Sequence, residues 1–265
     1  MWRKVKLLMT GRLISTPSFL ALHILHQVNS TSWEQREISP ANILLSRDGH
    51  GKLVDLDLAE TNTDKKHNVR QVSRSCQVTC AILMWMKGSR DFVPIEVASK
   101  TYRFLPNEVV MPPIFCYNFL HELESVWWIT IWMLFFHYPD PNVTGRLDQV
   151  RAVWELFPCY DHQSILDLRT SYICQSGKIE GIVANLHVDL RPYGNKLNKL
   201  RNSLLEAYSN FEVRLAGLCA QKHTKSSGEV LDGIYNDFRL AFQAMTKELE
   251  SKDVPLIHLY KVKYR

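Results

Sequence analysis

The chain has 265 residues, of which 46% are hydrophobic and 22% are charged. This composition is typical of a folded globular protein, and no low-complexity segment or internal repeat interrupts it. The formal net charge of +5 is small for this length, and the Lys and Arg residues are scattered along the sequence. A basic nucleic-acid-binding surface is not indicated, so we expect no nucleic acid among the partners.

The cysteines and the N-terminus further narrow the kind of protein and the compartment that we expect. Six cysteines lie at positions 76, 80, 116, 159, 174 and 219 and form no C-x-x-C pair. This spacing suggests neither a zinc site nor a disulfide framework. The apolar part of residues 1–9 is too short for a secretory signal or a membrane span. We therefore expect an intracellular protein, cytoplasmic or nuclear, that does not associate with a membrane.

The first predicted elements are a strand and a turn within residues 1–14, followed by a helix. Thr16 is a typical N-cap, and Pro17 suits the first position of a helix. Apolar side chains then recur at helical spacing as far as Val28. The sequence thus predicts an amphipathic helix before the first polar loop.

That loop has the layout of a phosphoryl-transfer catalytic loop. An arginine-acid pair, Arg36 and Glu37, is followed by Asn42 five residues after the acid. Asp55 comes thirteen residues after Asn42. In protein kinases, a loop with this spacing supplies a base and one metal ligand, and the next conserved aspartate supplies a second ligand.

A β-hairpin is predicted between Asn42 and Asp55. The apolar strand Ile43-Leu44-Leu45 is followed by a glycine-containing turn at residues 48–51, and the chain returns as Lys52 to Leu58. The hairpin would bring Asp55 back beside Asn42. A carboxylate and an amide oxygen there could hold Mg²⁺ against nucleotide phosphates. An ordinary surface hairpin with a few polar residues is the alternative interpretation.

A buried helix is predicted at residues 121–136. The largely apolar run from Val126 to Phe136 has 11 residues, fewer than the roughly 20 that cross a bilayer. A helix that is apolar on all sides belongs to the core of a globular protein. Glu122 lies in its first turn, where an acidic side chain also suits the helix dipole.

Three motifs in combination resemble the fungal-type protein kinases, a divergent kinase-like family. They are Arg36-Glu37-Ile38-Ser39 with Asn42-Ile43-Leu44, then Asp55-Leu56-Asp57-Leu58-Ala59 in place of D-F-G, then His121-Glu122-Leu123-Glu124-Ser125 followed by Trp132. The resemblance covers roughly residues 5–140. It implies a mainly α, protein-kinase-like α+β fold, with a large helical C-lobe and a short catalytic-loop β-hairpin.

The resemblance also implies the organisation of the chain as a single protein-kinase-like domain, 1–265. Residues 1–14 would be a hinge-like strand and turn, so the N-lobe, with its glycine-rich loop and its nucleotide-binding lysine, would be largely missing from this sequence. Residues 55–96 would be an activation-segment-like region. Residues 141–265 would be the helical C-terminal part.

Catalytic roles follow from the same resemblance. Glu37 would be the base, Arg36 a tether for the activation segment, and Asn42 and Asp55 the residues that bind Mg²⁺ and ATP. Three further positions would have structural roles. Gln35 replaces a histidine, Glu96 closes a Pro94-Ile95-Glu96 triplet in the place of A-P-E, and Glu122 replaces an aspartate that braces the catalytic loop.

The implied activity is ATP-dependent phosphorylation of serine or threonine in proteins. Glu37 and Glu122 each carry one methylene more than aspartate, and a displacement near 1 Å can cost about 100-fold in rate. We therefore expect impaired activity. One alternative is a catalytically dead pseudokinase that acts as a scaffold for an unknown protein partner. Another is a truncated gene product whose Met1 is an internal start.

The C-terminal part is predicted to consist of helices. Apolar spacing predicts them at residues 147–156, 197–218 and 230–250, with a further apolar stretch at 182–188. Arg191-Pro192-Tyr193-Gly194 has the composition of a turn. In the long helix after it, Leu200, Leu204, Leu205 and Tyr208 share one face.

Overall fold

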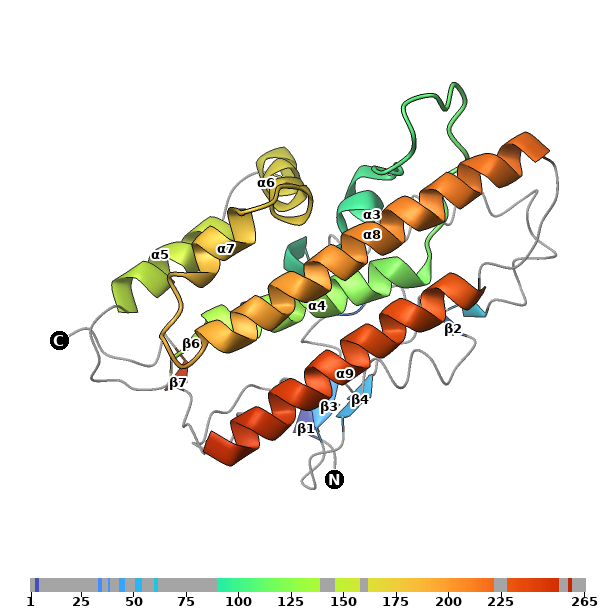
Figure 1. The fold of residues 1–265 in the computed structure, drawn as a ribbon. Coiled ribbons are helices and arrows are strands. Elements are labelled where there is room, and N and C mark those ends of the chain that lie inside the picture. Colours follow the sequence, from blue (N-terminus) through green and yellow to red (C-terminus); the bar gives the residue numbers. More distant parts are fainter. Residues whose placement is uncertain are drawn as a thin grey trace.

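The computed structural model describes residues 90–138, 146–157, 162–221 and 228–252, residue 38, and short strands at 3–4, 33–34, 43–45, 51–53, 60–61 and 257–258. Within these residues the chain is mainly α-helical, as the sequence predicts (Figure 1). The predicted helix after Thr16 and most of the region 55–96 lie outside the described residues.

The helical elements occupy the chain from residue 90 onward. In order they are the 3₁₀ turn η3 (Arg90–Phe92) and the helices α3 (Ile95–Ser99), α4 (Phe119–Phe135), α5 (Arg146–Leu156), α6 (His162–Cys174), α7 (Lys178–Val183), α8 (Arg191–Gln221) and α9 (Gly228–Lys252). The helices predicted at 147–156, 197–218 and 230–250 correspond to α5, α8 and α9. None of the described helices is long and apolar enough to cross a membrane.

The described strands are short and pair antiparallel. β3 (Ile43–Leu45) lies between β1 (Arg3–Lys4) and β4 (Gly51–Leu53). The other two pairs are β2 (Trp33–Glu34) with β5 (Glu60–Thr61), and β6 (His137–Tyr138) with β7 (Ile257–His258). In the β3–β4 pair Ile43 lies opposite Leu53 and Leu45 opposite Gly51.

Helix α4 begins at a capping box. The side chain of Asn118 accepts a hydrogen bond from the backbone N–H of Leu120 at 2.9 Å. In return, Nδ1 of His121 accepts one from the backbone N–H of Asn118, also at 2.9 Å. These bonds satisfy donors that have no partner within the helix, and they fix the residue at which α4 starts.

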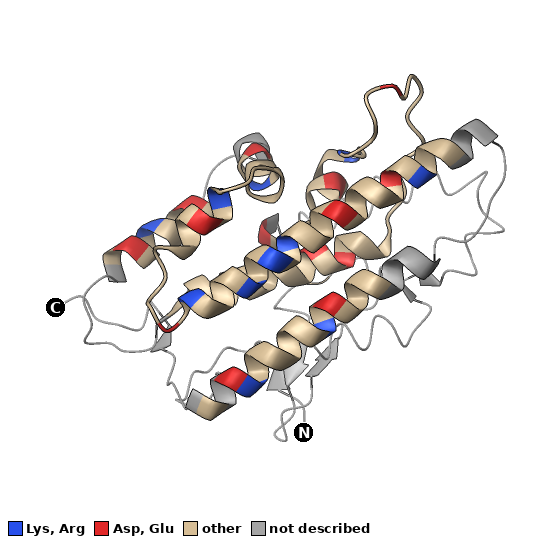
Figure 2. Cartoon of the chain, in the orientation of Figure 1, with Lys and Arg blue, Asp and Glu red and all other residues tan. Residues whose placement is uncertain are grey.

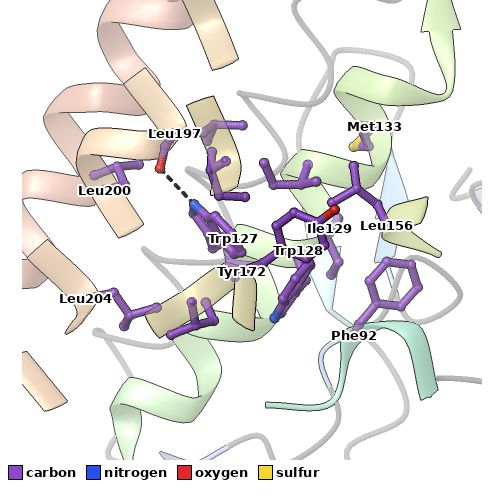
Figure 3. Packing of buried hydrophobic residues seen from close by; sticks show 14 of the residues in the cluster. Phe92, Trp127, Trp128, Ile129, Met133, Leu156, Tyr172, Leu197, Leu200 and Leu204 are labelled. Atoms are coloured by element: carbon purple, nitrogen blue, oxygen red, sulfur yellow. Dashed lines mark hydrogen bonds between the residues drawn. The ribbon is translucent and has the colours of Figure 1, made fainter. Parts of the chain in front are cut away.

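Nearly every side chain of α4 is buried, which confirms the predicted core helix. The helix packs against α5, α8, α9 and η3, and Figure 1 shows α4, α8 and α9 running side by side. Trp127 and Trp128 are fully buried, and Nε1 of Trp127 donates a hydrogen bond to the Leu197 carbonyl of α8 at 2.8 Å (Figure 3). Truncating a buried tryptophan to alanine typically costs about 3–5 kcal/mol, so this helix is a major source of stability.

One residue of the predicted catalytic loop belongs to the same core. Ile38, which follows Glu37 in the sequence, is 2% exposed and clusters with the buried side chains of α4. Phe92 of η3, Leu156 of α5 and Tyr172 of α6 complete this part of the core (Figure 3). Ile38, the central helix and the C-terminal helices therefore share one apolar cluster.

The prediction of a turn at residues 191–194 is wrong, because these residues form the first turn of α8. Proline is tolerated there, since the first N–H groups of a helix have no helical acceptor. Gly194 is needed for close approach to α7. A Cβ at this position would lie 2.8 Å from Val183 and 2.9 Å from Leu186. Proline and glycine therefore mark a helix start and a tight helix contact.

Candidate functional site

The described residues include only part of the predicted site. Gln35, Arg36, Glu37, Asn42 and Asp55 lie outside them. The two remaining positions, Glu96 and Glu122, are described, and both side chains are buried. Glu122 lies in the first turn of α4.

Glu96 lies in α3, the short helix that follows Pro94. Its Oε1 accepts a hydrogen bond from the backbone N–H of Arg103 at 2.7 Å. Its Oε2 lies 3.1 Å from Nε2 of His121. Because Nδ1 of His121 accepts from the Asn118 backbone, Nε2 carries a proton and donates it to Glu96. The acid of the predicted triplet is thus tied to the start of the central helix.

Glu212 of α8 approaches the same carboxyl group. Its Oε2 accepts a hydrogen bond at 2.8 Å from the backbone N–H of Phe104, the residue after Arg103, whose N–H binds Glu96. Burial, and after it the nearby Glu96 carboxyl, raise the pKa of Glu212 to about 9. Burial also raises the pKa of Glu96, to about 7. Two adjacent buried carboxyls avoid double ionisation, so the pair holds a proton, which we assign to Glu212.

Glu124, also on α4, has three hydrogen-bond donors around it. Its Oε1 accepts from the backbone N–H of Ile95 at 2.9 Å and from Nε1 of Trp128 at 3.1 Å. Its Oε2 accepts from the hydroxyl of Tyr208 at 2.8 Å. Complete burial raises the pKa of Glu124, while these donors oppose the rise. The side chain joins α3, α4 and α8 at one point.

Arg169 of α6 is a buried positive charge that acts on Glu124. Its guanidinium lies 4.3 Å from the centre of the Trp128 ring. It donates to the backbone carbonyl of Val93 at 2.7 Å and to that of Asp91. Burial lowers the pKa of Arg169 to about 10, so the group stays protonated at neutral pH. Through these bonds α6 holds the chain that enters α3.

Together these groups form a buried acid cluster, Glu96, His121, Glu124, Tyr208 and Glu212. Figure 2 shows acidic positions of α3, α4 and α8 gathered in this region. None of the five side chains is exposed, so the cluster cannot contact a substrate directly. Its chemical role is to anchor the backbone between α3 and α4.

The anchored backbone is the segment of residues 101–117, which contains no helix or strand. Near its start, the Phe104 ring stacks on Tyr208 with ring centres 5.1 Å apart. Near its end, the backbone N–H of Cys116 donates to the hydroxyl of Tyr102 at 3.0 Å. The middle of the segment exposes large apolar side chains: Val110 is 93% exposed and Met111 84%.

The partners of Glu96 were not identified from the sequence, although one signal was present. Tyr208 belongs to the predicted apolar face of α8, and Glu212 follows it by four residues, on the same face. An acid on an otherwise apolar helix face indicates a buried carboxyl with a specific partner. His121 gives no comparable signal, because its pairing with Glu96 depends on the tertiary fold.

The described residues contain no group of three His, Cys, Asp or Glu side chains placed to hold a metal ion. The predicted ligands Asn42 and Asp55 are not among the residues to which this applies. No protein-family model matches the chain, and no curated protein is significantly similar to it in sequence.

Proposed function

We propose that this chain is a protein-kinase-like protein of the fungal type, with an inherited activity of ATP-dependent phosphorylation of serine or threonine in proteins. The observation that carries the proposal is the burial of Ile38 in the α4 core. A catalytic loop supported by a central apolar helix is what the resemblance implies, and Ile38 directly follows the proposed base, Glu37.

The pairing of β3 with β4 also supports the proposal. Ile43 and Leu53 lie opposite each other at one end of the pair. Asn42 precedes Ile43 in the sequence, and Asp55 follows Leu53 by two residues. The proposed metal ligands therefore flank the same end of the paired strands in sequence.

The chemistry of these residues fits the proposed role. Amide and carboxylate oxygens are the ligands that Mg²⁺ takes in nucleotide sites, so Asn42 and Asp55 would hold Mg²⁺ with ATP. The nucleotide would supply the phosphoryl group. Glu37 would accept the proton of the substrate hydroxyl, and Arg36 would tether the activation segment. The longer side chain of Glu37 is the reason we propose an impaired rate.

A second candidate is a pseudokinase scaffold that binds a protein partner. The observation that favours it is the apolar tip of the 101–117 segment, where Val110, Met111 and Ile114 are all at least 70% exposed. Exposed apolar side chains grouped in this way are typical of binding surfaces. The scaffold would not need Mg²⁺-ATP.

Thermal unfolding with and without Mg²⁺-ATP separates the two functions. A ligand at 100 times its Kd adds about 2.7 kcal/mol to the unfolding free energy. For the kinase-like function we expect a higher Tm with Mg²⁺-ATP, a loss of this increase in Asp55→Asn, and an unchanged increase in the neighbouring control Asp57→Asn. If the folded wild-type chain shows no increase, the proposed nucleotide site is wrong and the scaffold remains.

A further inference from the structure

The two backbone amides at the start of the 101–117 segment bind two different buried carboxyls. The N–H of Arg103 donates to Glu96 at 2.7 Å, and the N–H of Phe104 donates to Glu212 at 2.8 Å. Both side chains are fully buried, and the two carboxyls lie close together because they accept from successive backbone amides. Successive residues of one segment thus depend on a carboxyl pair whose members come from α3 and α8.

A carboxyl pair of this kind holds together only while it retains a proton. The charged or titratable groups near it include Tyr102 and Arg103 of the segment, His121 and Glu124 of α4, Cys174 of α6 and Tyr208 of α8. Among these, only Arg103 has a fixed positive charge, and its side chain is exposed and donates from Nε to Ser99 at 3.2 Å. Glu124 adds negative charge nearby. The neighbouring groups therefore do not replace the proton.

We propose that Glu96 and Glu212 form a pH-sensitive latch: the proton held between them keeps the 101–117 segment closed on α4 and α8, and loss of that proton to solvent opens it. This proposal is independent of kinase activity. No covalent bond changes, and the only species transferred is the proton.

Opening follows from the cost of two adjacent carboxylates in a buried site. A buried charge without a partner costs far more free energy than an exposed one. The free energy of the deprotonated pair therefore falls when the pair reaches water. Water can reach it when Phe104 leaves Tyr208 and the two amides leave their carboxyls. The apolar tip at Val110 and Met111 is carried by the released segment, so the latch controls how rigidly that tip is presented.

Hydrogen exchange of the intact chain tests the latch, with peptides from residues 101–117 compared between pH 7 and 9. One linked proton changes an opening equilibrium tenfold per pH unit, so protection factors in wild type should fall by about 100-fold over this range. Glu212→Gln keeps the acceptor for Phe104 and offers an N–H in place of the proton. In this variant the protection factors of the 101–117 peptides should change less than about threefold between pH 7 and 9. The control Glu206→Gln, at an exposed position of α8, should behave as wild type.

The wild-type chain alone is enough to overturn the proposal. If its helices stay folded by circular dichroism and the 101–117 peptides keep constant protection from pH 7 to 9, there is no latch. Equal pH profiles for wild type and a folded Glu212→Gln would also reject it. If Glu212→Gln does not fold, the wild-type titration still decides.

Discussion

His121 makes two hydrogen bonds at once, and both require the tautomer with the proton on Nε2. Nδ1 accepts from the Asn118 backbone and so caps α4, while Nε2 donates to Glu96. Because both nitrogens are used, the ring cannot flip without breaking both bonds. The orientation of Glu96 is therefore fixed by the same histidine that starts the central helix.

Glu96→Gln should destabilise the chain by about 1–3 kcal/mol, the typical cost of an unsatisfied buried polar group. In either orientation its amide N–H₂ would face another donor, Nε2 of His121 or the backbone N–H of Arg103. Glu212→Gln should be at least as stable as wild type at pH 7, because its N–H₂ takes the place of the shared proton and no proton has to be taken up from solvent on folding. Urea denaturation of the two variants measures this, and equal losses of stability would contradict the proton assignment.

At this scale the sequence allowed a partial prediction. Glu96 and Glu122 were recognised from their motifs, and both are buried. The hydrogen bonds around Glu96 could not be predicted from the sequence, because they join distant positions. Phe104 and Glu212, for example, are 108 residues apart. No local spacing predicts such a contact before the fold is known.

The start of α8 shows how a glycine can be required by packing within a helix. Gly194 faces Val183 and Leu186 at distances that leave no room for a methyl group. Gly217, further along the same helix, has no heavy atom within 4 Å of the position that a Cβ would take. The two glycines therefore have opposite expected responses to substitution by alanine.

Gly194→Ala should lower the unfolding free energy by about 1–3 kcal/mol, because overpacking outweighs the gain in helix propensity. Gly217→Ala should raise it by about 0.5–1 kcal/mol, since only the propensity changes. Denaturant titrations of both variants provide the measurement. A stabilising Gly194→Ala would show that α7 can move away from α8.

Most described helices were predictable because their apolar periodicity is long and regular. Helices α3, α6 and α7 were not predicted individually, and in the first turn of α8 Pro192 and Gly194 were interpreted as turn residues. Proline in the first turn of a helix and glycine at a close helix contact are the same residue types that are common in turns. Only the position of α7 distinguishes the two cases.

For the molecule as a whole, the acid cluster sets a pH dependence of stability. The folded-state pKa of Glu96, about 7, and that of Glu212, about 9, lie above the ordinary value of 4.5. The folded chain therefore binds more protons than the unfolded chain between pH 4.5 and 9, and this contribution to stability is lost as pH rises through that range.

We expect the unfolding free energy of wild type to fall relative to that of Glu212→Gln between pH 5 and 9, by at most about 1.4 kcal/mol per pH unit for one linked proton. Urea titrations at several pH values give the difference, which removes the contribution of groups common to both proteins. A difference that grows in the opposite direction would mean that Glu212 is ionised in the fold.

The mainly α-helical character of the described residues was predictable from the sequence, because regular apolar periodicity and one fully apolar helix leave a clear pattern. The kinase-like arrangement rests on motifs between residues 35 and 59, of which the structure describes Ile38 and the paired strands β3 and β4. These motifs indicate phosphoryl-transfer chemistry only through the types and the spacing of their residues. Their geometry depends on tertiary contacts that no spacing encodes.

The tryptophan pair at the centre of α4 also has a spectroscopic consequence. The rings of Trp127 and Trp128 are 4.8 Å apart at an interplanar angle of 75°, close enough for their electronic transitions to couple. Trp154 on α5 is 53% exposed. The near-ultraviolet circular dichroism of the coupled pair thus reports on the integrity of the core, while Trp154 is the exposed indole among the tryptophans whose burial the structure describes. The chain carries intrinsic optical probes for its interior and its surface.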